Sequence, residues 1–290
     1  MGELRHDPHR QTRSPVNGAA ERLVDDDRSV ADLRIRLFGA IRLIWRGREV
    51  RLAGRNARAL IAILAMERRP RFRESIAAHL WPDLGEAEAS SALRQSLWLL
   101  KGAMGEAGVD PAAILDSDKE RIGLQAGGAI DLDVARFEDC MLGPPVRVEE
   151  AIELYGGDLA EGVSLECLAR DRERLADLFE DALAEASQRR LRDGDLAGAR
   201  DAAVRLLRLD PLREEAHTVL IELHGLTGSR SQVWRQYRRL RAILATELDV
   251  EPLPETDTAF RIAMRRAAAR SDHPGAWAPG SERAVARTRG

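Results

Sequence analysis

Five side chains with the chemistry of nucleic-acid contact recur along one face of a predicted helix over residues 86–104: Ser91, Arg94, Gln95, Trp98 and, at the edge of the face, Lys101. A helix turns by about 100° per residue, which brings these positions to one side. Arginine and lysine reach phosphate oxygens or guanine edges, and glutamine can pair with adenine. This face is therefore suited to the major groove of double-stranded DNA.

The opposite side of this helix is apolar. Its residues recur at spacings of four, three and four, the step of a buried helical face: Leu93, Leu97, Leu100 and Met104. A short helix over 74–81 and a turn at Pro82 and Asp83 come before it, which is the order of a helix-turn-helix. A packed helix pair with a solvated polar face would show the same pattern. The flanking segments therefore have to distinguish a DNA-binding helix-turn-helix from such a helix pair.

The flanking segments predict a winged helix with an N-terminal sheet. Residues 33–52 alternate apolar residues with arginine around a turn at 46–49, the pattern of a small antiparallel sheet with one polar face. An amphipathic helix over 54–69 ends at Pro70, because proline cannot continue a helix. The remaining elements are expected to be a short strand over 71–73, a loop over 105–113, a hairpin over 114–124 and a last strand over 130–133.

The second half is predicted to be almost entirely helical and to contain a repeat. Helices are expected over 149–155 and 168–192. Gly194 and Gly228 lie 34 residues apart, and three apolar pairs keep the same offset: Ala199 with Val233, Leu206 with Leu240, and Leu209 with Ile243. A 34-residue period with paired amphipathic helices is the tetratricopeptide signature. Such repeats stack into a concave surface that binds peptides or other proteins.

Composition and charge limit the class of protein. The formal net charge is -3, but residues 33–137 hold 17 Lys and Arg against 13 Asp and Glu, so the remainder is acidic. This division suits a DNA-binding domain joined to a protein-interaction domain. No apolar run approaches the ~20 residues of a membrane span, and the two cysteines, Cys140 and Cys167, form no disulfide framework. We expect a cytoplasmic protein without membrane contact.

The residues do not predict an enzyme. Lys101 and Lys119 lie in no phosphate-binding G-x-x-x-x-G-K-[ST] motif. His217 and His224 are seven residues apart on one helical face, which is too far for a shared metal ion. No local signature indicates a catalytic serine or cysteine. We expect no catalytic residue, no metal and no cofactor.

Several motifs, in the right order, resemble the SARP-type bacterial transcriptional activators, in which an OmpR-like winged-helix DNA-binding domain precedes a bacterial transcriptional activator domain. The first domain is matched by LRIRLFG at 33–39, RAL at 58–60, LWPD at 80–83, SALRQSL at 91–97 and DLDVARF at 131–137. The second is matched by LYGGDL at 154–159, the helix 168–193, GDL at 194–196, LDP at 209–211 and ELDVEP at 247–252. The expected domains are 33–142 and 146–267, with a disordered arm over 1–32 and a disordered tail over 268–290.

The resemblance implies a sequence-specific DNA-binding regulator, and more narrowly an activator. The helix 86–104 would enter the major groove, and Lys119 or Arg121 in the wing would touch backbone phosphate. Arg71 and Arg73 are further candidate phosphate contacts. The helical domain would form a homodimer or dock to RNA polymerase, at its sigma factor and at the C-terminal domain of its alpha subunit. Two protomers would bind promoter direct repeats spaced by roughly one helical turn.

One departure from the family pattern leaves an alternative open. Family recognition helices commonly carry further basic residues where this chain has Leu99 and Gly102. The alternative is a tetratricopeptide-type interaction adaptor whose degenerate winged helix no longer binds DNA. Both alternatives share one predicted fold class, which is mainly α, with an N-terminal winged helix and small antiparallel sheet followed by an all-α tetratricopeptide-like repeat domain.

Overall fold

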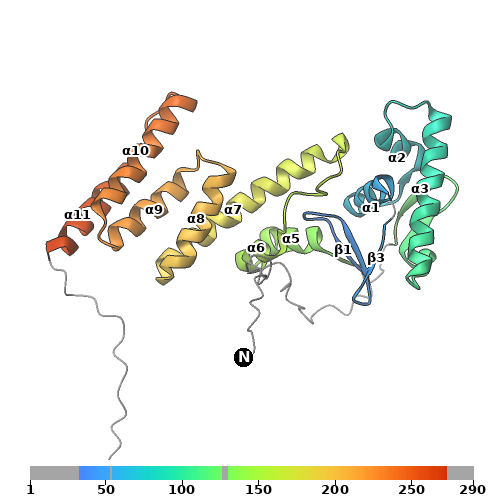
Figure 1. Cartoon of the computed structure of the whole chain (residues 1–290), viewed down its shortest axis with the longest axis horizontal. Helices are drawn as coiled ribbons and strands as arrows, with labels where there is room; N and C mark the ends of the chain where they lie inside the picture. The colour runs from blue at the N-terminus through green and yellow to red at the C-terminus, as the bar shows by residue number, and fades with distance from the viewer. Residues whose placement is uncertain (1–32, 53, 126–129, 273–290) are drawn as a thin grey trace, which may run out of the picture.

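The structure is a computed structural model that describes residues 33–52, 54–125 and 130–272 (Figure 1). The predicted arm over 1–32 and the residues after 272 lie outside this part of the chain. Helix α3 (Glu86–Glu106) stands at one end of the elongated molecule, and α10 (Arg230–Glu247) and α11 (Pro254–Asp272) stand at the other. Among the described helices, none has the length and apolar character needed to cross a membrane.

The first sheet has the strand order β3-β2-β1-β7. Its members are β1 (Leu33–Arg36), β2 (Arg42–Trp45), β3 (Arg48–Val50) and β7 (Ile130–Leu132). Strands β1, β2 and β3 pair antiparallel, as the alternation of apolar and arginine residues predicts, whereas β7 joins β1 in parallel. Arg36 and Asp131 form an ion pair of 2.7 Å across this parallel pair. The predicted strand at 130–133 therefore completes the N-terminal sheet rather than the wing.

The helices and hairpin of the winged helix follow in the predicted order. They are α1 (Arg55–Glu67), β4 (Arg71–Phe72), α2 (Arg73–Leu80), α3, α4 (Pro111–Ile114), β5 (Leu115–Ser117) and β6 (Arg121–Leu124). The hairpin strands β5 and β6 pair antiparallel, and β4 pairs with β6 as the third strand of a second sheet.

The loop expected over 105–113 was partly wrong. Helix α3 continues to Glu106, and α4 begins at Pro111, where a proline fits the first helical turn. The side chain of Asp110 caps α4 by accepting a hydrogen bond of 3.0 Å from the amide of Ala112. A short capped helix therefore replaces part of the loop and leads directly into the wing.

The second half is a series of antiparallel helices. They are α5 (Asp133–Leu142), α6 (Val148–Leu154), the 3-10 turn η1 (Glu166–Leu168), α7 (Ala169–Asp193), α8 (Leu196–Leu209), α9 (Glu214–Leu226), α10 and α11. Gly194 and Gly228, with φ of 84° and 81°, take the left-handed backbone conformation that glycine tolerates, each shortly before the next helix of the series. Helix α11 runs on to Asp272, beyond the expected start of the tail at 268.

The 34-residue repeat is visible in the burial of its apolar pairs. Ala199 and Val233 are both buried, and so are Leu206 and Leu240. The third pair differs, because Leu209 is 49% exposed at the end of α8. Four of the six paired positions thus form the core between successive helices, and the register of the repeat holds until α8 ends.

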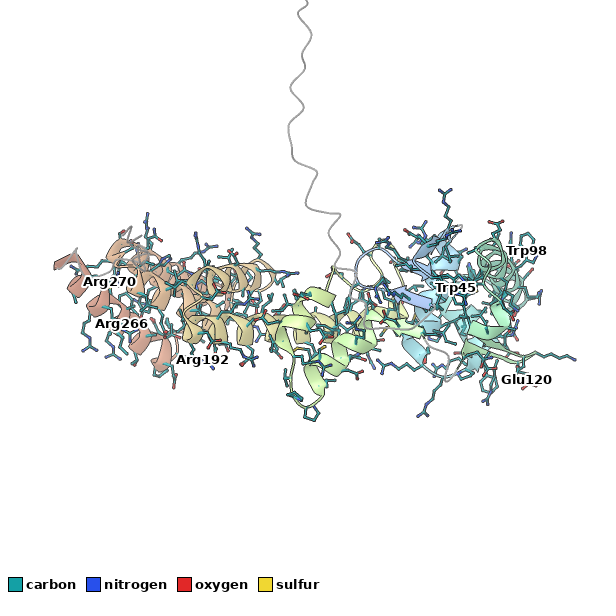
Figure 2. All side chains as sticks on the ribbon, turned by 90° about the horizontal axis from the view of Figure 1, so that it is seen from below. Trp45, Trp98, Glu120, Arg192, Arg266 and Arg270 are labelled. Atoms are coloured by element: carbon teal, nitrogen blue, oxygen red, sulfur yellow. The ribbon has the colours of Figure 1, made fainter. Side chains whose placement is uncertain are left out.

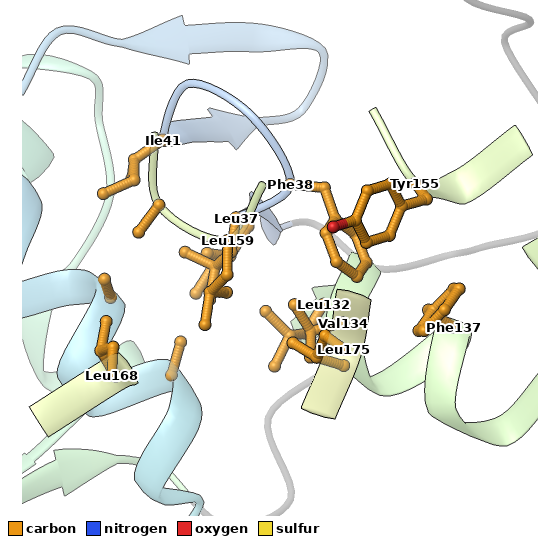
Figure 3. Packing of buried hydrophobic residues seen from close by; sticks show 14 of the residues in the cluster. Leu37, Phe38, Ile41, Leu132, Val134, Phe137, Tyr155, Leu159, Leu168 and Leu175 are labelled. Atoms are coloured by element: carbon orange, nitrogen blue, oxygen red, sulfur yellow. The ribbon is translucent and has the colours of Figure 1, made fainter. Parts of the chain in front are cut away.

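The two halves share one hydrophobic core. A single cluster of buried residues extends from Leu33 in β1 to Leu220 in α9. Residues 158–161, after α6, run beside the end of β1 and are held there by three backbone hydrogen bonds of 2.7–2.9 Å. Phe38, Phe137 and Tyr155 pack together at this junction (Figure 3). The winged helix and the helical half are therefore fixed to each other by backbone and side chains.

Candidate nucleic-acid interface

The centre of the candidate interface is the outer face of α3. Its inner stripe is buried as predicted: Leu93, Leu97, Leu100 and Met104. The five side chains predicted for the outer face are all exposed: Ser91, Arg94, Gln95, Trp98 and Lys101. Trp98 is 73% exposed, the largest exposed fraction among the large apolar side chains of the described residues. A tryptophan this open to solvent is available to a partner.

Local sequence explains where α3 begins. The chain leaves α2 through a turn in which the Leu84 amide donates a hydrogen bond of 3.2 Å to the Trp81 carbonyl. Glu86 and Glu88 lie in the first turn of α3, where carboxylates stabilise the positive end of the helix dipole. The acidic residues thus gather at the start of the helix, and the cations Arg94 and Lys101 lie further along it.

The wing is the β5–β6 hairpin, and its turn is fixed by one carboxylate. Asp118 Oδ1 accepts hydrogen bonds from the amides of Arg121 at 2.6 Å and Glu120 at 2.7 Å. Both hydrogen bonds lower the pKa of the Asp118 carboxyl, and the bond from the Arg121 amide contributes most. Lys119 is exposed at the tip of the turn. The exposed Arg121 guanidinium lies over the Phe72 ring, 4.5 Å from its centroid, in a cation–π contact.

The other two candidate phosphate contacts differ from each other. Arg71 is exposed and forms an ion pair of 3.2 Å with Glu67, one helical turn back along the chain. Arg73 is half-buried, and its guanidinium donates a hydrogen bond of 2.7 Å to the Ser117 hydroxyl. The Arg73 amide also donates to the Glu120 carbonyl at 2.8 Å. Arg73 therefore fastens the wing to α2, so its side chain is less available for phosphate than that of Arg71.

The structure brings the helix face and the wing to the same end of the molecule. Trp98 of α3 and Glu120 at the wing turn both lie at the end opposite Arg192, Arg266 and Arg270 (Figure 2). Leu99, whose type departs from the family pattern, is half-buried and so turns partly away from the outer face. At Gly102 the helix surface is exposed and open. The outer face therefore keeps its five exposed side chains, and neither Leu99 nor Gly102 adds a charge to it.

Two residues that hold the junction between the halves were not predicted as site residues, although both lie in segments that match the family. Asp133 lies at the start of α5 and accepts hydrogen bonds from the amides of Leu37 at 2.9 Å and Phe38 at 3.0 Å. Burial raises the pKa of the Asp133 carboxyl, against the amide bonds that lower it. Arg172 of α7 donates to the carbonyls of three residues in the junction, namely Leu159, Val163 and Leu165. The signal in the sequence was their position, Asp133 in the DLDVARF segment and Arg172 in the matched helix 168–193.

The described residues hold no group of three or more His, Cys, Asp or Glu side chains placed to bind a metal ion. His217 is buried in α9, with Nδ1 2.8 Å from the amide nitrogen of Gln236 and Nε2 3.1 Å from the Pro211 carbonyl oxygen. Burial lowers the pKa of His217. This histidine is held by neighbours within the helical repeat.

Comparison with known proteins supports the resemblance to SARP-type activators. Residues 144–261 match the bacterial transcriptional activator domain. The fold is similar to that of Mycobacterium tuberculosis EmbR, solved in complex with a low affinity phosphopeptide. The TM-score is 0.64 and the sequence identity is 21%. The match covers 83% of this chain and 70% of that chain. No curated protein sequence matches the chain. The predicted fold class, mainly helical with a small N-terminal sheet and a repeat-like second half, is confirmed.

Proposed function

We propose that the chain regulates transcription by binding specific double-stranded DNA. Its match to the bacterial transcriptional activator domain and its EmbR-like fold support this proposal, because the two together are expected of a SARP-type transcriptional activator. Its winged helix reads the operator, and its helical half contacts protein. The observation that supports this best is the outer face of α3, where two cations, a glutamine and an open tryptophan lie above a fully buried stripe.

Each part of the interface has a separate role in this proposal. Arg94 and Gln95 contact base edges in the major groove, and each good base contact contributes ~1–3 kcal/mol of discrimination. Lys101 and Ser91 position the helix on phosphates, and Lys119, Arg121 and Arg71 add phosphate contacts from the wing side. Phosphate contacts give affinity without sequence preference and make binding depend on salt. Arg73 serves mainly to hold the wing in place.

The helical half supplies the protein contacts of the regulator. Its helices bury two apolar clusters, a large one that reaches Leu220 and a smaller one of Ile221, Val233 and Ala263. Stacked helices of this kind present an extended surface to other proteins. We propose that this half docks to RNA polymerase, through the sigma factor and the C-terminal domain of the alpha subunit, or pairs two protomers on direct repeats. Because the two halves share one core, a contact made by the helical half is held at a fixed orientation to the DNA.

The experiment is recovery of genomic DNA fragments by the purified protein across a salt series. We expect enrichment of a few fragments that share a repeated sequence and that are lost steeply as salt rises. The Arg94→Ala, Lys101→Ala double variant should lose this enrichment. Exposed arginines of the helical half, changed in the control Arg170→Ala, Arg208→Ala, should leave it intact.

Absence of enrichment even at low salt would overturn DNA binding and favour the adaptor alternative. That alternative also predicts that the Arg94→Ala, Lys101→Ala variant regulates normally in cells. Transcript levels in cells that carry the variant separate the two, because the regulator requires this face of α3 and the adaptor does not.

A further inference from the structure

The helical half contains a groove of about 460 Å³ that lies far from the candidate DNA interface. Three helices form it: the last turns of α7, α9 from its first residue Glu214 to Glu222, and the first turn of α11. Arg192, which lines the groove, is at the end of the molecule opposite Trp98 (Figure 2). The groove is therefore a separate surface of the protein.

The chemistry of the groove combines an apolar floor with acidic walls. Leu191, Val219 and Leu253 supply apolar surface. Three further lining residues are glutamates that form no ion pair within the described part of the chain: Glu215, Glu222 and Glu255. A fourth, Glu214, is already engaged, because it accepts hydrogen bonds from the Leu253 amide at 3.0 Å and the Thr256 hydroxyl at 2.9 Å. With Arg192 as its one lining cation, the groove favours a cationic occupant that also carries apolar side chains.

The chain itself contains a segment of this chemistry. Residues 273–290, which follow α11, include three arginines, one glutamate and one tryptophan, namely Arg283, Arg287 and Arg289 with Glu282 and Trp277. The segment before β1 differs in sign, because residues 1–32 hold seven acidic residues against five arginines. Charge complementarity thus selects the C-terminal segment over the N-terminal one.

The attachment point allows the segment to reach the groove. Glu255 and Thr256 line the groove at the start of α11, and the segment begins after Asp272 at the other end of this helix. Sixteen helical residues rise about 24 Å. Eleven extended residues, from 273 to Arg283, span up to about 36 Å. The arginines can therefore return to the glutamates without any change in α11.

From these observations we propose that residues 273–290 bind in the groove of the same chain, with their arginines on Glu215, Glu222 and Glu255 and apolar side chains on the floor. The covalent link gives such a segment an effective concentration in the millimolar range, so weak individual contacts suffice. Another protein would gain access to the groove only by displacing the segment. This inference concerns the helical half alone and does not depend on DNA binding.

The test is trypsin cleavage of the intact protein, followed by mass spectrometry at Arg283 and Arg287. We expect cleavage at these sites to be about tenfold slower in the wild type than in the Glu215→Gln, Glu222→Gln, Glu255→Gln variant, since the variant loses three ion pairs at or near the surface. The matched control changes three exposed glutamates away from the groove: Glu153→Gln, Glu166→Gln and Glu173→Gln. The control should retain the slow cleavage, and circular dichroism should show that all three proteins are folded.

Equal cleavage rates in the three proteins would overturn the proposal. A second measurement uses a labelled peptide of residues 273–290 and a chain that stops at Asp272, once this chain is shown to melt like the intact protein. We expect saturable one-to-one binding that the groove variant weakens about tenfold, and absence of binding would again overturn the proposal. Protection from trypsin that disappears on dilution would assign the groove to a second copy's segment and overturn the intramolecular contact.

Discussion

The ring of Phe38 lies 4.6 Å from the ring of Tyr155, measured between centroids. Phe38 follows the first strand of the N-terminal sheet, and Tyr155 follows α6 in the helical half. Tyr155 also stacks on Phe179 of α7, with centroids 3.9 Å apart and planes 3° apart. Through these three rings the sheet of the winged helix is packed onto the longest helix of the second half.

The shared core predicts that the two halves unfold together. Phe38→Ala should lower the free energy of unfolding by about 3–5 kcal/mol, the usual cost of removing a buried phenylalanine. Urea unfolding followed by circular dichroism and by tryptophan fluorescence should give one coincident transition, before and after the substitution. Phe72→Ala is the control, since Phe72 is 51% exposed and its loss should cost far less. Two separated transitions in the wild type would contradict a shared core.

The two tyrosines should ionise well above the usual alkaline range. Burial, with the nearby Asp158, raises the pKa of Tyr155 to about 12. Burial and the hydrogen bond to Asp257 raise the pKa of Tyr237 to about 12. Absorbance of tyrosinate in the folded protein should therefore appear near pH 12 rather than near 10.

These raised pKa values also set the sign of alkaline stability. Below pH 10 both tyrosines are protonated in the folded and unfolded states, so their contribution is fully present. As the pH rises from 10 toward 12, the unfolded chain loses these protons first and stability falls. Tyr155→Phe should flatten the alkaline decline of the unfolding free energy, and an unchanged slope would contradict the assignment.

A lysine ammonium group should not restore the stability that the Arg172 guanidinium provides. Its nitrogens donate to the carbonyls of Val163 at 2.6 Å, Leu159 at 2.9 Å and Leu165 at 3.1 Å. Lysine keeps the charge but cannot reproduce three divergent donors on one planar group. We expect Arg172→Ala to cost about 2–3 kcal/mol, and Arg172→Lys to recover less than half of it, by thermal unfolding. The exposed Arg170→Ala is the control and should stay near the wild type.

Trp98 should contribute to affinity for the operator and little to the stability of the fold. Its 73% exposure means that Trp98→Ala removes few internal contacts, so the unfolding free energy should change by less than about 0.5 kcal/mol. Affinity for an enriched operator should fall severalfold in a binding titration at constant salt. The exposed Leu142→Ala, 66% open and away from α3, should change neither quantity. A strongly destabilised Trp98→Ala protein would mean that the indole is part of the core.

Local patterns predicted helix α3 because its buried face follows from periodicity alone. Leu93, Leu97, Leu100 and Met104 repeat at the helical step, and all four are buried. The same reasoning predicted the exposed face, since the residues on the side opposite the apolar stripe must face solvent. DNA binding by that face depends on a second molecule, so it could not be predicted from periodicity and burial within one chain.

Long-range pairing was beyond the same reasoning. The pattern at 130–132 indicated a strand but could not name β1 as its partner, which lies nearly a hundred residues earlier in the chain. Nor did any spacing indicate that Asp133 would bond the amides of Leu37 and Phe38, because a carboxylate at a helix start is ordinarily exposed. Arg73 shows a different limit of residue type: a phosphate contact was predicted from the arginine alone, and only the structure shows that its guanidinium donates to Ser117 of the wing.

Helix α7 passes from the shared core, where Leu175 is buried, to the groove, which Leu191 helps to line. Its 25 residues are one unbroken helix of about 38 Å. Inserting a single residue in its middle would rotate the distal helices by about 100° and advance them by about 1.5 Å relative to the winged helix. If the proposed function holds, the residue count of α7 would set the rotational phase between the DNA and the protein that the helical half contacts.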